Sequence, residues 1–281
     1  MTAPTIPPAT TMGAVHLSVS DLARSLEFWE GTVGLEALEQ ADGRASLGAG
    51  GRELLVLVEE PGARPAYGYT GLFHLALLVP ARADLARWLA HAARERVPLQ
   101  GLSDHYVSEA IYLGDPDGHG IEIYADRPRQ VWAGQVDLRM TTLPLDVDAL
   151  LSELDDPDTE PFAGLPGGTR IGHVHLRVAR VPDTVDFYRD ILGFEVMARF
   201  DDQAVFLAAG GYHHHIGANT WQSAGALPAP EGTARLLHAT VVLPDQAARD
   251  ELLARVGELE QTPAGPLVRD PSGNALVLAA A

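Results

Sequence analysis

The sequence of 281 residues contains no cysteine, so disulfide bonds and thiolate chemistry are both excluded. A bound metal would therefore need histidine and carboxylate side chains as its ligands. Basic residues are also scarce, because 20 Lys+Arg stand against 38 Asp+Glu and the formal net charge is −18. This charge argues against nucleic acid and anionic membrane surfaces as partners.

Long hydrophobic runs are absent as well. No uninterrupted apolar stretch is long enough to cross a bilayer as a helix. The opening MTAPTIPPATT has neither the basic start nor the apolar stretch of a secretory signal. We therefore expect a soluble, cytoplasmic protein with no membrane partner.

The most informative feature that is present is a repeat. The segment GAVHLSVSDLARSLEFWEGTVGL at 13–35 returns as GHVHLRVARVPDTVDFYRDILGF at 172–194. In the same way LFHLALLVP at 72–80 returns as LLHATVVLP at 236–244, and DPDGHGIEI at 115–123 returns as DPSGNALVL at 270–278. The chain is long enough for two domains, and the repeat predicts two similar halves.

Each half contains two blocks that read as a strand, a helix and three short strands. In the first block GAVHLSV alternates apolar and polar residues, which is typical of a half-buried strand. Ser20 is the expected N-cap of the helix that follows, and Gly34 is expected to end it. The pattern predicts an α+β fold of four βαβββ modules paired into two domains, each a curved, cup-like mixed sheet with helices on the outside.

The predicted domains follow the order of the chain. Residues 1–125 are expected to form a metal-binding domain of two modules, and residues 170–281 a second domain of two modules with an altered metal site. The segment 126–169 is acidic and rich in Pro and Gly, which indicates a connector. Within it, Asp146–Leu154 is a candidate short helix.

Strand alternation places three metal-type side chains on one surface. His16, His74 and Glu122 each lie opposite the apolar residues of their own strand, on three separate strands. A carboxylate between two isoleucines needs a partner or a metal, because an unpaired buried charge is costly. Two imidazoles and one carboxylate leave coordination positions open, which is the facial arrangement of non-haem Fe(II) oxygenases. We therefore predict a metal site at these three residues.

The second half repeats this arrangement only in part. It has His175 and His238 at the matching positions, but Val277 replaces the carboxylate. The run Tyr212-His213-His214-His215 leaves a second site open, formed by His175, His215 and His238. The alternative is a hydrogen-bonded polar lining of a vestigial cavity.

At these residues the chain resembles the vicinal-oxygen-chelate superfamily, which includes glyoxalase I, bleomycin and fosfomycin resistance proteins, and extradiol catechol dioxygenases. The segment DHYVSEAIYLGDPDGHGIEIY at 104–124 is similar to the extradiol dioxygenase signature. The matching positions are His105, Ile111, Tyr112, Asp115, Pro116, Gly118 and Glu122. The resemblance is closest to two-domain catechol-2,3-dioxygenase-like proteins.

The resemblance implies an Fe(II)-dependent extradiol dioxygenase that cleaves the ring of a small aromatic diol with O2. Fe(II), or alternatively Mn(II), would be held by His16, His74 and Glu122. His105 would act as the acid/base residue, and Tyr112 would hydrogen-bond the substrate. Such proteins often associate, so a homo-oligomer is a further expectation.

Two other functions remain open at this point. One is a metal-dependent lyase or isomerase of the glyoxalase type, for which Glu53 or Glu59 could supply a second carboxylate. The other is a non-catalytic, bleomycin-resistance-like protein that would bind a cationic ligand through its acidic surface. The set of His16, His74 and Glu122 favours the dioxygenase over both.

Overall fold

The structure is a computed structural model that describes residues 4–281. Its main strands are β1 (Thr11–Val19), β2 (Glu36–Ala41), β3 (Arg44–Ala49), β4 (Arg52–Glu59), β6 (Gly71–Leu78), β7 (Gly101–Asp104), β8 (Ser108–Gly114), β9 (Gly120–Asp126), β11 (Arg170–Arg177), β12 (Glu195–Phe200), β13 (Ala204–Ala208), β14 (Ile216–Asn219), β16 (Leu236–Leu243), β17 (Glu260–Thr262), β18 (Gly265–Arg269) and β19 (Ala275–Ala280). Three two-residue strands complete them: β5 (Arg64–Pro65), β10 (Leu143–Pro144) and β15 (Thr233–Ala234).

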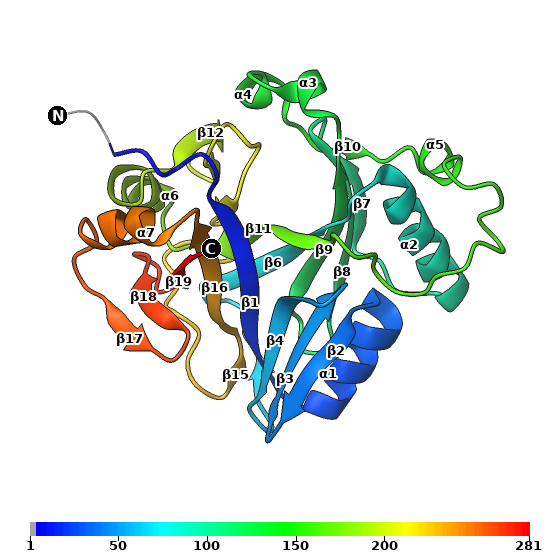
Figure 1. Cartoon of the computed structure of the whole chain (residues 1–281), viewed down its shortest axis with the longest axis horizontal. Coiled ribbons are helices and arrows are strands. Elements are labelled where there is room, and N and C mark those ends of the chain that lie inside the picture. The colour runs from blue at the N-terminus through cyan, green and yellow to red at the C-terminus, as the bar shows by residue number, and fades with distance from the viewer. Residues whose placement is uncertain (1–3) are drawn as a thin grey trace.

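Helices cover the outer sides of the strands (Figure 1). They are α1 (Leu22–Phe28), α2 (Arg82–Glu95), α3 (Arg129–Trp132), α4 (Val136–Arg139), α5 (Val147–Leu151), α6 (Val181–Val185) and α7 (Gln246–Leu253). Two π-helical turns, η1 (Trp29–Val33) and η2 (Asp186–Ile191), continue α1 and α6.

Local chemistry explains where the first helix begins and ends. Asp21, and not the predicted Ser20, is the N-cap, because its side chain accepts a hydrogen bond of 3.0 Å from Arg24 N. The Ser20 hydroxyl instead donates to Asp117 at 2.6 Å. Gly34 ends η1 with φ of 88°, a left-handed conformation that favours glycine.

Two large sheets carry the four modules. One has the strand order β17-β18-β19-β16-β1-β4-β3-β2, and the other β10-β7-β8-β9-β6-β11-β14-β13-β12. In every module the first strand runs parallel to the fourth, while the remaining neighbours are antiparallel, so both sheets are mixed. The predicted α+β fold of curved mixed sheets is confirmed.

The pairing of the modules differs from the prediction. The first module (β1–β4) shares a sheet with the fourth (β16–β19), and the second (β6–β9) shares a sheet with the third (β11–β14). The halves 1–125 and 170–281 are therefore not the units that form the sheets. We call the first sheet the His16 sheet (β1–β4 and β16–β19) and the second the His74 sheet (β6–β14).

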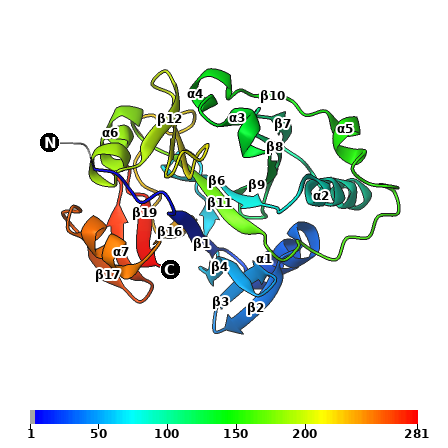
Figure 2. The ribbon, with the colours of Figure 1, turned by 45° about the horizontal axis from the view of Figure 1, so that its top comes forward.

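Antiparallel pairing of first strands joins the modules in both sheets. In the His74 sheet β6 lies beside β11, and His74 is opposite His175 (Figure 2). In the His16 sheet β1 lies beside β16, and His16 is opposite His238. All four modules present a similar first strand as an edge, so the local pattern is compatible with either way of pairing them.

The connector 126–169 packs against the helix of the second module. Arg82 of α2 donates to the Ala149 carbonyl at 2.9 Å and contacts Glu153 at 2.8 Å. Arg87 pairs with Glu160 at 2.8 Å. The short helix predicted within Asp146–Leu154 is confirmed as α5.

Candidate metal centre and cavity

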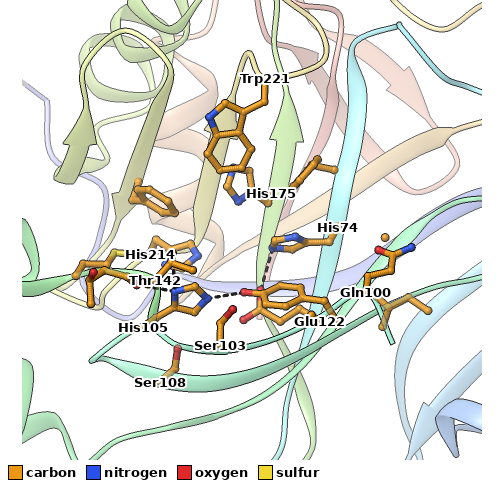
Figure 3. Close-up of a pocket in the computed structure, with 18 of the residues that line it drawn as sticks. His74, Gln100, Ser103, His105, Ser108, Glu122, Thr142, His175, His214 and Trp221 are labelled. Carbon is orange, nitrogen blue, oxygen red and sulfur yellow. Dashed lines mark hydrogen bonds and ion pairs between the residues drawn. The ribbon is translucent and has the colours of Figure 1, made fainter. Parts of the chain in front are cut away.

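A cavity of about 400 Å³ opens over the His74 sheet (Figure 3). Its wall combines metal-type and proton-carrying side chains with aromatic rings: Phe73, His74, Gln100, Ser103, His105, Ser108, Tyr112, Glu122, Met140, Thr141, Thr142, His175, Phe200, Phe206, His214 and Trp221. Among the described residues, neither lysine nor arginine lines it, and Glu122 is its one acidic residue. The wall thus combines polar side chains with aromatic and other apolar ones.

Three side chains from three strands meet at the base of this cavity, and two of them, His74 and Glu122, line it. His74 from β6, Glu122 from β9 and His173 from β11 place one ligand-type atom each within 4.8 Å of the others. Glu122 Oε2 lies 2.9 Å from His74 Nε2 and 3.1 Å from His173 Nε2. All three side chains are buried, with 6%, 2% and 1% exposure for His74, Glu122 and His173.

At position 120, next to this cluster, the backbone leaves no room for a side chain. Gly120 begins β9 beside His74, and a Cβ there would lie 2.1 Å from the Phe73 carbonyl oxygen. Glycine therefore allows β9 to approach β6 closely enough to bring Glu122 next to His74.

The electrostatics of the cluster favour a bound cation. Burial by itself would raise the pKa of Glu122, but the adjacent His173 and His74 hold that pKa well below its usual range. Burial lowers the pKa of His173 to about 4, so this imidazole is neutral near pH 7. A carboxylate beside the neutral imidazole of His173 is in the protonation state that metal ligation requires.

Two ring nitrogens of the cluster, His74 Nε2 and His173 Nδ1, have no hydrogen-bond partner among the described residues. His74 Nε2 is buried and makes no hydrogen bond, although Glu122 Oε2 is only 2.9 Å away. A ring nitrogen held against a carboxylate oxygen without hydrogen-bond geometry is typical of two ligands that converge on one ion. The two imidazoles and one carboxylate fit a divalent transition metal, and they match the facial triad of non-haem Fe(II) enzymes.

The predicted triad of His16, His74 and Glu122 is corrected by this arrangement. His74 and Glu122 come together, but His16 lies in the other sheet, where its ring stacks on His238 with a centroid distance of 3.9 Å. His173 occupies the third position. Among residues 4–281, His74, Glu122 and His173 form the one group with metal-binding geometry.

Strand register explains why His173 was missed. The repeat aligns His16 with His175, and these two occupy the same place in their sheets, opposite His238 and His74. The ligand lies two residues earlier on the same face of β11, where His173 is opposite Ala76, which in turn is opposite Glu122. The matching position in the first module is Ala14. The first histidine of GHVHL, His173, which has no counterpart in GAVHL, is the clue that the sequence contains.

The second site proposed for His175, His215 and His238 does not assemble. His238 lies in the His16 sheet, while His175 lies beside His74 with ring centroids 5.0 Å apart. His215 accepts a hydrogen bond from Ala209 N at 3.2 Å through Nδ1. Of the three residues, His175 lines the cavity described above, and neither His175 Nε2 nor His238 Nε2 has a hydrogen-bond partner within residues 4–281.

The second carboxylate required by the glyoxalase-type alternative is also elsewhere. Glu53 and Glu59 lie on β4 of the His16 sheet, and Glu59 accepts a hydrogen bond from Leu22 N at 3.0 Å. Neither residue lines the cavity.

His105 and Tyr112 both line the cavity, and the ring centroid of Tyr112 is 5.5 Å from that of His74. His105 Nδ1 is 2.7 Å from the Thr141 carbonyl oxygen, which can only accept, so this nitrogen carries the proton. The Tyr112 hydroxyl then donates to His105 Nε2 at 2.7 Å. Burial and the nearby Glu122 raise the pKa of Tyr112 well above its usual value, so its hydroxyl stays protonated.

His214 is a further cavity residue that the sequence did not single out. It comes from the turn between β13 and β14, and its ring lies against His173 with centroids 3.9 Å apart. Its Nδ1 is 2.8 Å from His213 Nδ1, behind the cavity wall. Burial lowers the pKa of His214 well below its usual value. Its position within a run of three histidines gave no indication of which one would reach the cavity.

None of the helices in the described part of the chain could cross a membrane.

Comparisons with known proteins agree with this architecture. The family described as the Glyoxalase/Bleomycin resistance protein/Dioxygenase superfamily matches residues 11–123 and 170–278. A protein named catechol-2,3-dioxygenase from Bacillus subtilis (strain 168) is 40% identical over 278 residues, covering 95% of this chain and 96% of its own length.

Solved structures show the same fold at low sequence identity. Glyoxalase I from Zea mays superposes with a TM-score of 0.58 at 17% identity, covering 96% of this chain and 92% of its own. The cppA protein from Streptococcus pneumoniae TIGR4 superposes with a TM-score of 0.56 at 15% identity, covering all of both chains.

Proposed function

Because this chain belongs to the glyoxalase/bleomycin resistance protein/dioxygenase superfamily, we propose that it is a metal-dependent extradiol dioxygenase. In this proposal it cleaves the ring of a catechol-type substrate with O2. The relative named catechol-2,3-dioxygenase, 40% identical over almost the whole chain, supports this activity. The observation that carries the proposal is the cluster of His74, Glu122 and His173 at the base of a cavity large enough for a small aromatic ring.

In this proposal His74, Glu122 and His173 hold Fe(II), with Mn(II) as the alternative. When bound, such a metal supplies Lewis acidity toward two adjacent hydroxyls and a route for electrons from the diolate to O2. Three protein ligands would leave other coordination positions of such a metal open to the reactants.

The cavity wall fits an aromatic ring. Phe73 and Trp221 pack edge to face with a centroid distance of 5.5 Å, and Phe206 packs similarly against His175. Aromatic side chains in these arrangements provide faces and edges against which a substrate ring can pack. The wall would therefore orient the diol toward the cluster and exclude water from the rest of the cavity.

The remaining polar residues suggest distinct roles. Tyr112 keeps its proton and donates it to His105 Nε2, so its oxygen can accept a hydrogen bond from a substrate hydroxyl, while His105, with both ring nitrogens already bonded, orients the Tyr112 hydroxyl. The acid/base role first expected for His105 is better suited to His214, because no described residue hydrogen-bonds its Nε2.

The two alternative functions receive less support. A glyoxalase-type lyase or isomerase would need a second carboxylate in the cavity, and the described lining residues include only Glu122. A non-catalytic binding protein would have no need for a buried cluster of metal ligands. Cytoplasmic location and a homo-oligomeric state remain predictions from the sequence.

The direct test is purification under anaerobic conditions, followed by metal analysis and measurement of O2 uptake with catechol. We expect about one iron per chain and equal consumption of catechol and O2, with formation of a yellow ring-opened product. Protein loaded with Zn(II) is the control, because zinc has no redox chemistry and should bind without O2 uptake. Iron-loaded protein that consumes no O2 with catechol or alkylcatechols would rule out the proposed activity.

A further inference from the structure

A chain of hydrogen bonds leads from the cavity wall to a separate surface hollow. His213 Nδ1 is 2.8 Å from His214 Nδ1, and His213 Nε2 is 2.8 Å from Asp126 Oδ1. His214 lines the main cavity, whereas Asp126 lines a second hollow together with Arg82, Arg127 and Arg170. His213 lies between them and is completely buried.

The donors and acceptors along this chain can be assigned from the far end. The Asp126 carboxylate can only accept, and it also accepts from the Tyr212 hydroxyl at 3.1 and 3.2 Å. His213 must therefore donate through Nε2–H. A neutral His213 then has a bare Nδ1, and the close contact with His214 requires the proton to be on His214 Nδ1.

A competing assignment places a second proton on His213. The imidazolium would then donate to Asp126 and to His214, leaving the His214 proton on Nε2. Both contacts of His213 are already satisfied without this additional proton. The neutral assignment is favoured.

We propose that Asp126 and His213 are positioning residues that fix His214 in its Nδ1–H tautomer. This tautomer presents the bare Nε2 to the cavity as an acceptor for a substrate hydroxyl. The other tautomer would present an N–H group, which cannot accept. The expected effect on catalysis rests on the proposed function. The tautomer of His214 does not, because it can be measured without any enzymatic activity.

Surrounding contacts suit the chain to this purpose. The Tyr124 hydroxyl bonds the Tyr212 hydroxyl at 2.9 Å, so two buried tyrosines help to hold Asp126. The His213 ring packs against Trp132 and Tyr212, with centroids 5.5 and 4.0 Å away. An aromatic replacement at 213 therefore has neighbours against which it can pack.

The first test measures the tautomer directly. Protein labelled with ¹⁵N-histidine and loaded with diamagnetic Zn(II) is examined by NMR, and a His214→Gln variant identifies the His214 signals. We expect the proton on Nδ1 and a bare Nε2 in the wild-type protein. In His213→Phe, which removes the acceptor but keeps an aromatic ring, the Nε2–H tautomer should appear. An Nε2–H in the wild type, or an unchanged tautomer in His213→Phe, would overturn the proposal.

The second test uses a matched pair of variants in steady-state kinetics with catechol. His213→Asn keeps an acceptor for His214 Nδ1–H through its amide oxygen, whereas His213→Phe does not. We expect kcat to fall by about 100-fold in His213→Phe with little change in KM, and His213→Asn to restore most of it. If the role of His213 were purely structural, kcat would fall to the same extent in both variants. If the wild type shows no ring cleavage, the proposed function fails, while the NMR result still decides the tautomer.

Discussion

The His74 sheet and the His16 sheet are built from equivalent modules in the same register, but they differ at the positions that would bind a metal. His74 lies two residues before the partner of Glu122, and His238 lies two residues before the partner of Val277. Where the His74 sheet has His173, the first module has Ala14. The His74 sheet therefore has the three ligands His74, Glu122 and His173, whereas the His16 sheet has a counterpart of one of them, His238.

The difference extends to the residues beside the metal cluster. Tyr112 pairs with Glu122 across β8 and β9, whereas Leu267 pairs with Val277 across β18 and β19. Leu267, Ala275 and Val277 form a buried apolar cluster in the His16 sheet. The central pair of histidines is common to both sheets, so that pair does not distinguish a sheet with a metal cluster from one without.

The largest expected effect is the loss of the third ligand from the His74 sheet. His173→Ala leaves two protein ligands, so we expect bound metal to fall to near zero and ring-cleaving activity to fall by at least about 1,000-fold. His16→Ala, the matched change in the other sheet, should leave metal content unchanged. Metal analysis and kinetics check both variants. Loss of metal in His16→Ala with retention in His173→Ala would instead support the triad expected from the sequence, His16, His74 and Glu122.

Removing one hydroxyl should have a smaller effect. Tyr112→Phe loses the hydroxyl that His105 orients but keeps the ring, so we expect kcat to fall by about 10- to 100-fold while metal content is retained. Tyr106→Phe is the control. The Tyr106 hydroxyl donates to the Val131 carbonyl oxygen at 3.0 Å, and Tyr106 does not line the cavity. Equal activities of the two variants would argue against a role for Tyr112.

The comparison can also be tested by building the missing site. Ala14→His with Val277→Glu gives the His16 sheet the same three residue types at equivalent positions. We expect bound metal to rise from about one to about two per chain, because ligand type and geometry govern affinity. Ala14→His with Val277→Gln is the control of matched shape. If the first variant binds no additional metal, equivalence of register is insufficient for a site.

The smallest expected effect concerns the pH dependence of stability. Burial lowers the pKa of His16 to about 3, with the neighbouring His238 and Arg44 adding to the shift, and lowers that of His238 to about 4. The unfolded chain, with histidines near 6.5, binds more protons over this range, so stability should fall as pH drops from about 6.5 to 4.

Replacing both rings, as in His16→Phe with His238→Phe, should make that dependence shallower. The change is at most about 1.4 kcal/mol per pH unit for each ring, less where solvent reaches it. Urea unfolding of the metal-free protein at several pH values measures it. An unchanged slope would indicate that these rings are already protonated in the folded state.

Much of the candidate site was predictable because side-chain direction in a strand is a local property. Alternation with a period of two placed His74 and Glu122 on the inner face of their strands, and the segment 104–124 placed His105 and Tyr112 beside them. The same rule puts His173 and His175 on one face of β11, so alternation alone could not choose between them. His214 lies in a turn, where no period applies.

The sequence by itself determined the four modules, their α+β class, two of the three clustered ligands and the absence of thiolate chemistry. Tertiary structure alone decided that the second module pairs with the third, and therefore that His173 joins His74 and Glu122 while His16 does not. The physical reason is that module edges of similar pattern offer similar hydrogen bonds and apolar surface, so partner choice depends on the whole chain.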